Sequence, residues 1–124
     1  MFLASGADDF RLTSGGGSSA TTNLQAIGNS TVPILAGVTF TSGAFQTTGG
    51  KRIVVTCATD QAGNLSVEQS PDNVNYLGTR EIKLKPNELN AFEVDVVSPF
   101  ARIRLENGSS NQTFLRLYWY LSST

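Results

Sequence analysis

The side chains that could perform acid–base or metal chemistry are few in this sequence, and they are dispersed. The chain contains no histidine and one cysteine, Cys57. Zinc and copper sites depend on imidazole and thiolate ligands, so neither is expected. A Ser–His–Asp triad and a Cys–His pair are excluded because the chain has no histidine to act as the base. Thr48-Gly-Gly-Lys51 lacks the spacing of a phosphate-binding loop, and a hairpin turn explains it.

Two pairs of carboxylates deserve comparison with catalytic or metal-binding pairs. Asp8 and Asp9 could bind a hard cation, but a solvated pair near a terminus is the simpler interpretation. Glu93 and Asp95 alternate outward along a strand pattern, at a separation that acid–base catalysis could use. Any polar strand face has the same spacing, so we favour a structural role. The sequence therefore predicts no enzyme, no catalytic residue, no metal and no cofactor.

Cys57 lies in the apolar strand pattern Ile53-Val-Val-Thr-Cys-Ala58 and in register with Ile53 and Val55. A free cysteine in such a pattern packs as a small hydrophobic side chain. A reactive thiol would need a nearby base, for which the chain offers no histidine. We therefore expect Cys57 to be a buried structural thiol.

Size and charge indicate one globular domain. The chain has 124 residues, of which 40% are hydrophobic and 15% charged, and its net charge is −1. A general nucleic-acid-binding protein would need a basic excess, so no nucleic-acid partner is expected. No apolar stretch approaches the length of a transmembrane helix, and the N-terminus does not have the pattern of a secretory signal. These features predict synthesis in a cytoplasm and no membrane partner.

From residue 32 onward, strand patterns of period two alternate with turn signals about every ten residues. This spacing predicts an all-β fold, an antiparallel β-sandwich or jelly roll, over residues 32–124. The expected strands are Ile34–Phe40, Arg52–Thr59, Asn64–Ser70, Thr79–Leu84, Phe92–Val97, Ala101–Glu106 and Thr113–Leu121, with short pieces near Ala44–Thr47 and Asn75–Leu77.

Residues 1–31 differ in composition from the rest of the chain. The segment Thr13-Ser-Gly-Gly-Gly-Ser-Ser-Ala-Thr-Thr22 is rich in small polar residues and has no apolar period. Phe2, Leu3 and Phe10 are scattered apolar anchors, too few for a core. The sequence leaves two interpretations open: a disordered tail, or an extended N-terminal arm that becomes ordered against a neighbouring subunit.

The last third of the chain contains the most suggestive basic and aromatic residues. If its two strands form a hairpin through Asn107–Asn111, one face carries Arg102, Arg104, Arg116, Tyr118 and Tyr120. Arg102 would then face Arg116, and since facing arginines repel each other, an ion-pair cluster with Glu93 and Asp95 is the structural interpretation. A subunit interface is the functional one, because arginine and tyrosine are enriched in interface cores. Trp119 is expected in the core.

Three segments carry a resemblance to known proteins: Gly63-Asn-Leu-Ser-Val-Glu-Gln-Ser-Pro-Asp-Asn-Val-Asn-Tyr76, Phe92-Glu-Val-Asp-Val-Val-Ser-Pro-Phe-Ala-Arg-Ile-Arg-Leu-Glu-Asn-Gly108, and Gln112-Thr-Phe-Leu-Arg-Leu-Tyr-Trp-Tyr120. Together they resemble small β-sandwich virion structural proteins of tailed bacteriophages and prophages. The resemblance covers roughly the C-terminal half. Asp72-Asn73 and Tyr76 replace the Asp-Gly and Trp of that group, and no catalytic residue is implied.

An N-terminal arm joined to one sandwich is similar to head decoration, or cement, proteins. The resemblance implies a location on the capsid surface of the virion, the major capsid protein as partner, and self-association, often as a trimer. Phe2, Leu3, Phe10 and the arginine and tyrosine residues above would then form interfaces. The alternative is a tail or baseplate adhesion module that binds glycans through Tyr118 and Tyr120.

Overall fold

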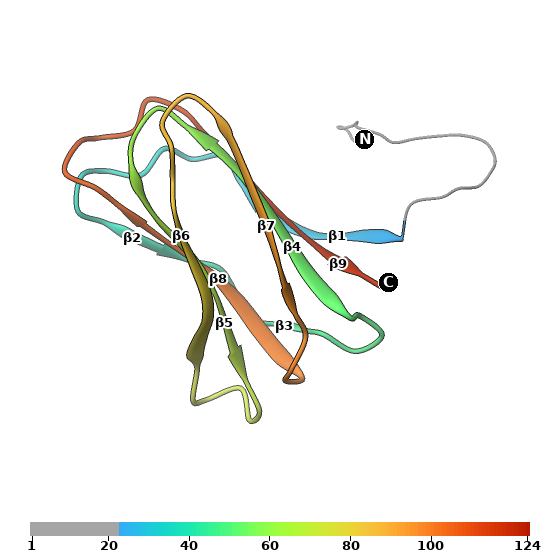
Figure 1. The fold of residues 1–124 in the computed structure, drawn as a ribbon. Coiled ribbons are helices and arrows are strands. Elements are labelled where there is room, and N and C mark those ends of the chain that lie inside the picture. The colour runs from blue at the N-terminus through green and yellow to red at the C-terminus, as the bar shows by residue number, and fades with distance from the viewer. Residues whose placement is uncertain (1–22) are drawn as a thin grey trace, which may run out of the picture.

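The computed structural model describes residues 23–124, which form two antiparallel β-sheets and contain no helix (Figure 1). The expectation of an all-β sandwich is confirmed. The expected arm anchors Phe2, Leu3 and Phe10 lie outside the described residues. In order along the chain, the strands are β1 (Leu24–Ser30), β2 (Thr39–Thr41), β3 (Phe45–Gln46), β4 (Arg52–Thr59), β5 (Gly63–Ser70), β6 (Leu77–Lys83), β7 (Leu89–Asp95), β8 (Phe100–Asn107) and β9 (Leu115–Ser122).

The first sheet, sheet A, has the strand order β1-β9-β4-β7, and the second, sheet B, has the order β2-β8-β5-β6 with β3 also paired to β8. The two sheets face each other across one hydrophobic core. Alternate side chains of the central strands enter this core, as expected for half-buried strands. Its fully buried large members include Ile53, Leu65, Ile103, Leu105 and Leu117.

Trp119 and Cys57 are both in the core, as the sequence predicts. Trp119 is 6% exposed, and its ring is tilted against Phe40 at a centroid distance of 6.2 Å. Cys57 is fully buried. Its burial raises the pKa of the thiol to about 12, so the reactive thiolate is scarce at neutral pH.

The sheet begins earlier in the chain than the sequence pattern indicates. Strand β1 (Leu24–Ser30) falls within the range assigned to the arm and pairs with β9. Its register shifts between Ala26 and Gly28, and this bulge interrupts the alternation of apolar and polar residues. Conversely, the expected strand Ile34–Phe40 is largely a loop in which Ile34 alone is buried, and only its end joins β2.

The expected hairpin between the last two strands is wrong. β8 pairs with β2, β3 and β5, whereas β9 pairs with β1 and β4, so the chain crosses from one sheet to the other. The buried side chain of Asn107 donates hydrogen bonds to the carbonyl oxygens of Ile34, Leu35 and Ser110. These bonds fix an arch rather than a tight turn. Period-two alternation is the same in both arrangements, so it could not distinguish them.

No helix among residues 23–124 is long and apolar enough to cross a membrane.

Candidate functional site

The arginine and tyrosine residues expected on one face lie on opposite faces of the sandwich, because β8 and β9 belong to different sheets. Arg102 and Arg104 project from the outer face of sheet B, and Arg116, Tyr118 and Tyr120 from that of sheet A. The expected pairing of Arg102 with Arg116 is therefore wrong. No single site can contain all five side chains.

On sheet B, Arg102 is held by partners from its own chain. Its Nε donates to Glu68 Oε1 at 2.7 Å, and its guanidinium lies 4.1 Å from the centre of the Tyr76 ring. The Tyr76 hydroxyl donates to Asn73 Oδ1, in the turn that follows β5. The expected ion-pair cluster of Arg102 with Glu93 and Asp95 is therefore wrong: Arg102 is ion-paired with Glu68, and Glu93 and Asp95 lie 3.6 and 3.8 Å from Arg52.

On sheet A, Tyr118 and Tyr120 stand two residues apart on β9, so both are on the outer face. Tyr118 is opposite Asn29 and Thr56, and Tyr120 is opposite Ala26 and Val54. Both rings are half-buried. We call this surface the tyrosine face; it consists of Ala26, Asn29, Val54, Thr56, Tyr118 and Tyr120.

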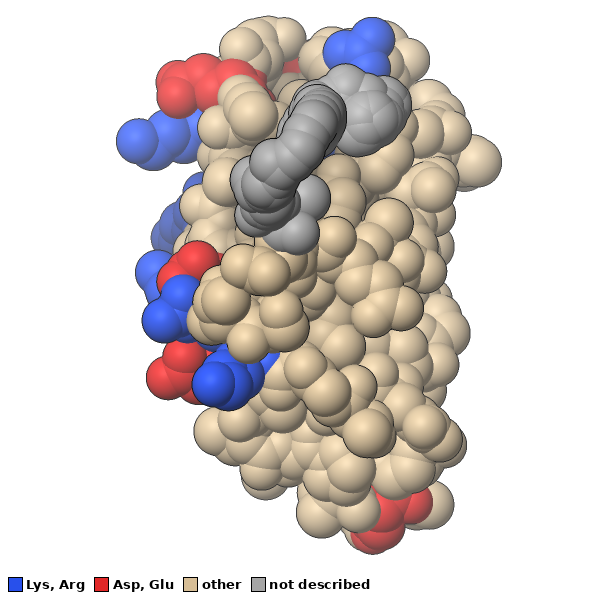
Figure 2. All heavy atoms as spheres, turned by 90° about the vertical axis from the view of Figure 1, so that its right-hand side faces the viewer, with Lys and Arg blue, Asp and Glu red and all other residues tan. Residues whose placement is uncertain are grey.

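The side of the molecule next to the tyrosine face has no charge. No Lys, Arg, Asp or Glu occurs between Arg11 and Lys51, a range that includes β1, β2, β3 and their connections. Val32, Leu35 and Val38 in this range are 72%, 63% and 48% exposed. We call residues 23–50 the uncharged flank. Figure 2 views the side on which Figure 1 shows β1 and β9. The charged side chains seen from this side lie along one edge of the molecule and at its two ends, and the surface between them is uncharged apart from what the grey residues cover.

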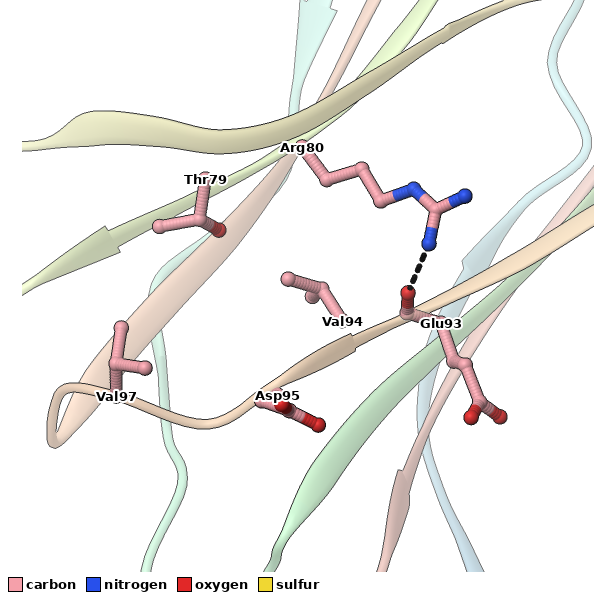
Figure 3. Close-up of a pocket in the computed structure, with 6 residues that line it drawn as sticks. All are labelled: Thr79, Arg80, Glu93, Val94, Asp95 and Val97. Carbon is pink, nitrogen blue, oxygen red and sulfur yellow. Dashed lines mark hydrogen bonds between the residues drawn. The ribbon is translucent and has the colours of Figure 1, made fainter.

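The opposite flank of the sandwich is open between β6 and β7. Among the described strands, β6 pairs only with β5, and β7 only with β4. A groove of about 540 Å³ lies between them, lined by Thr79, Arg80, Glu93, Val94, Asp95 and Val97 (Figure 3). We call it the edge groove. Its volume is in the range of pockets that hold small molecules or single side chains.

The edge groove is apolar inside and has one cation at its rim. The side chains of Thr79, Val94 and Val97 point into the space between the strands, whereas the carboxylates of Glu93 and Asp95 point away from it (Figure 3). Arg80 extends from β6 across the opening and donates from Nη1 to the Glu93 carbonyl oxygen at 2.9 Å.

Gln69 closes one end of this flank. Its side chain, 3% exposed, donates from Nε2 to Thr79 Oγ1 and to the Asp95 carbonyl oxygen at 3.1 and 3.0 Å. Its Oε1 accepts from the backbone N–H groups of Val97 and Ser98 at 2.9 and 3.2 Å. Gln69 and Arg80 thus donate hydrogen bonds to the carbonyl oxygens of Asp95 and Glu93, on the edge of β7 that pairs with no described strand. Such capping hinders the addition of a further strand.

Two aspartates in turns have strongly perturbed acidity for structural reasons. The backbone N–H and hydroxyl of Thr113 donate to Asp60 at 2.9 and 2.8 Å and lower its pKa to about 2. The N–H groups of Asn75 and Val74 hold the pKa of Asp72 well below its usual range. Residues 23–124 contain no group of three or more acidic, histidine or cysteine side chains placed to hold a metal ion.

The geometry defines a two-sheet β-sandwich with the uncharged flank along one edge and the edge groove along the other. The chain belongs to the family described as the uncharacterised protein YqxG N-terminal domain, whose model matches residues 14–122. No curated protein matches the sequence.

Comparison with solved structures supports the fold. The crystal structure of the PBSX exported protein XepA has a TM-score of 0.76 and 17% identity, and the alignment covers 87% of this chain and 40% of XepA. The chain therefore spans well under half the length of XepA. A family 4 carbohydrate-binding module has a TM-score of 0.49, 12% identity and coverage of 82% and 79%. CsCBM6-3 of Clostridium stercorarium, solved with cellobiose, has a TM-score of 0.43, 18% identity and coverage of 87% of each chain. Similarity as low as that of the last two carries no information about ligands.

Proposed function

We propose that this chain is a non-catalytic structural protein of a tailed phage or prophage and, more specifically, a capsid decoration protein that binds the outer head surface. The observation that carries the proposal is the uncharged flank next to the tyrosine face. The exposed aliphatic side chains of the uncharged flank can be buried against another protein without desolvating charges. The fold it shares with XepA, a prophage protein, supports the phage context.

The partners in this proposal are the major capsid protein and further copies of the chain. A decoration protein makes modest contacts that the symmetry of the head repeats many times. Each contact can therefore be weak, which suits a surface with exposed valine and leucine side chains. We place the protein on the capsid surface of the virion, where its contacts stabilise the head against the pressure of the packaged DNA.

The test is the copy number per purified virion, measured by quantitative mass spectrometry against the major capsid protein. Decoration predicts hundreds of copies per particle. The binding surface is tested by Val32→Asp with Leu35→Asp, both exposed on the uncharged flank, which should abolish binding to heads that lack the protein. Val74→Asp, equally exposed but on the β5–β6 turn, is the matched control and should bind normally. A count below a few dozen would contradict decoration.

A tail or baseplate glycan-binding module is the second candidate, and the tyrosine face is the observation that favours it. Two tyrosines two residues apart on a strand, beside Asn29 and Thr56, offer aromatic contact and hydrogen bonding to a sugar. Tyr118→Ala would then abolish glycan binding by the isolated protein and leave its fold intact. Binding of heads by that variant, without any glycan affinity in the unmodified protein, would reject this candidate.

A further inference from the structure

We propose that the edge groove receives the segment Asp8-Asp9-Phe10 of a second copy of this chain. The ring of Phe10 would occupy the apolar space over Val94 and Val97, and a carboxylate of Asp8 or Asp9 would bind Arg80. This inference deepens the proposed function, because it names the contact by which copies join one another.

The groove is suited to a segment in which an aromatic residue stands beside a carboxylate. Its interior contains the side chains of Thr79, Val94 and Val97, and Val97 is 69% exposed, so an inserted ring would remove apolar surface from water. One guanidinium hydrogen bond of Arg80 is found among the described residues. Since an arginine has five N–H donors, the remaining ones can bind a carboxylate.

The acidic residues near the groove do not cancel this positive charge. The carboxylates of Glu93 and Asp95 point away from the groove interior, and both lie within 4 Å of Arg52. Arg80 is therefore the charged group that an occupant of the interior would meet. Before the start of β1, aromatic side chains occur at Phe2 and Phe10, and Phe10 directly follows two acidic residues.

The described chain begins at the edge of sheet A that lies opposite the edge groove. One cross-strand row of sheet A runs from β1 to β7 through Leu24, Ser122, Arg52 and Asp95. The residue that follows the arm, at the start of β1, and the groove therefore lie on opposite edges of sheet A. Residues 11–23 can span at most about 45 Å when extended, which is enough to pass beyond the sheet edge into a neighbour.

The resulting contact is head to tail, with the arm side of one copy against the groove side of the next. A contact of this type closes into a ring if the rotation between copies permits it. The uncharged flank, which includes the root of the arm at β1, would face the neighbour. A closed trimer is one such ring.

The first experiment measures the mass of the full chain in solution by light scattering over a range of concentrations. The proposal predicts an oligomer that dissociates at least tenfold more readily when Arg80→Asp or Phe10→Ser is introduced. Lys83→Asp, the same charge change on β6 but outside the groove lining, is the matched control and should associate normally. Combining Asp8→Arg and Asp9→Arg with Arg80→Asp should restore association. A monomer at all concentrations, or unchanged association of both variants, would overturn the proposal.

The second experiment identifies the occupant. Chains with Arg11→Cys, next to the anchor ring, and chains with Asp95→Cys, whose side chain points away from the groove interior, are mixed and treated with a short bismaleimide; Cys57 is buried and remains unmodified. Cross-linked heterodimers in the mixture are expected. Cross-links that form only within a chain carrying both changes would show that the arm occupies its own groove and would overturn the second-copy assignment. These measurements use free protein, so their failure leaves the head-binding test independent.

Discussion

At the scale of single residues, Gln69 joins the two sheets across the open flank. It is buried and contacts β6 through Thr79, the last residue of β7 through one backbone carbonyl, and the β7–β8 connection through two backbone N–H groups. The strand pattern Asn64–Ser70 gave no indication of this role, because side-chain hydrogen bonds to distant backbone groups leave no periodic signal. The sequence likewise predicted an ion pair for Arg102 but not its partner Glu68, since the pairing depends on which strands are neighbours.

Replacing Gln69 by leucine should destabilise the fold. The change leaves the N–H groups of Val97 and Ser98 and the Asp95 carbonyl without their partner, and unsatisfied buried polar groups cost about 1–3 kcal/mol each. We expect a loss of about 3 kcal/mol in the free energy of unfolding, measured by urea denaturation. Gln46→Leu, at an exposed position of β3, is the control and should change it by less than about 0.5 kcal/mol. Equal effects of the two variants would contradict the role assigned to Gln69.

Asp60 should contribute to acid sensitivity. Its pKa is about 2 in the folded chain against 3.8 for the unperturbed group. The charged form is therefore favoured by folding: its contribution is complete above about pH 4 and is lost as the pH falls through about 2. Asp60→Asn should make the free energy of unfolding fall less steeply between pH 4 and pH 2. Asp72, whose pKa is also lowered, should keep part of the slope. Identical slopes in the variant and the unmodified chain would show that Asp60 does not contribute.

At the scale of secondary structure elements, patterns within one strand were more informative than relations between strands. The sequence located β4 to the residue and most other strands to within about two residues at each end, because β4 has strict apolar alternation. The order of the strands in the two sheets could not be predicted from these patterns. Whether β8 and β9 pair depends on the arch that Asn107 holds together with the loop after β1, a contact between residues more than 70 positions apart.

The sequence pattern did not reveal strand β1, because the bulge between Ala26 and Gly28 interrupts its alternation. Gly28, which packs against Trp119 of β9, allows the pairing of β1 with β9 to be tested. A Cβ atom there would lie 2.7 Å from Trp119 Cζ2, closer than a carbon–carbon contact allows. Gly28→Ala should therefore push β1 away from β9 and cost about 1–3 kcal/mol. It should also shift Trp119 fluorescence to the red as water reaches the ring. Gly43→Ala, where the added atom meets open space, should have neither effect. An unchanged emission spectrum for Gly28→Ala would place Trp119 away from β1.

At the scale of the whole molecule, charge is distributed unevenly around the sandwich. The first described residues up to Gly50 carry none, and the ion pairs of Arg52 and Arg102 lie on strands outside that range. Protein surfaces normally mix charges of both signs, so an uncharged flank with exposed aliphatic side chains supports the proposed interaction surface. The sequence shows the uncharged run directly. That β1, β2 and β3 lie at one side of both sheets follows only from the strand order.

The division between the arm and the sandwich can be tested by two truncations that differ by eight residues. All strands and the core of the described residues lie within Leu24–Ser122, so deletion of residues 1–22 should lower the Tm by no more than a few degrees while abolishing self-association. Deletion of residues 1–30 also removes β1, which exposes the edge of β9 and the packing site of Ile27. This second deletion should lower the Tm by roughly 10 °C, because a loss of about 2 kcal/mol shifts the Tm of a domain of this size by such an amount. If the shorter deletion destabilises the chain as much as the longer one, residues 1–22 contribute to the sandwich itself, and the groove of a second copy is not their binding site.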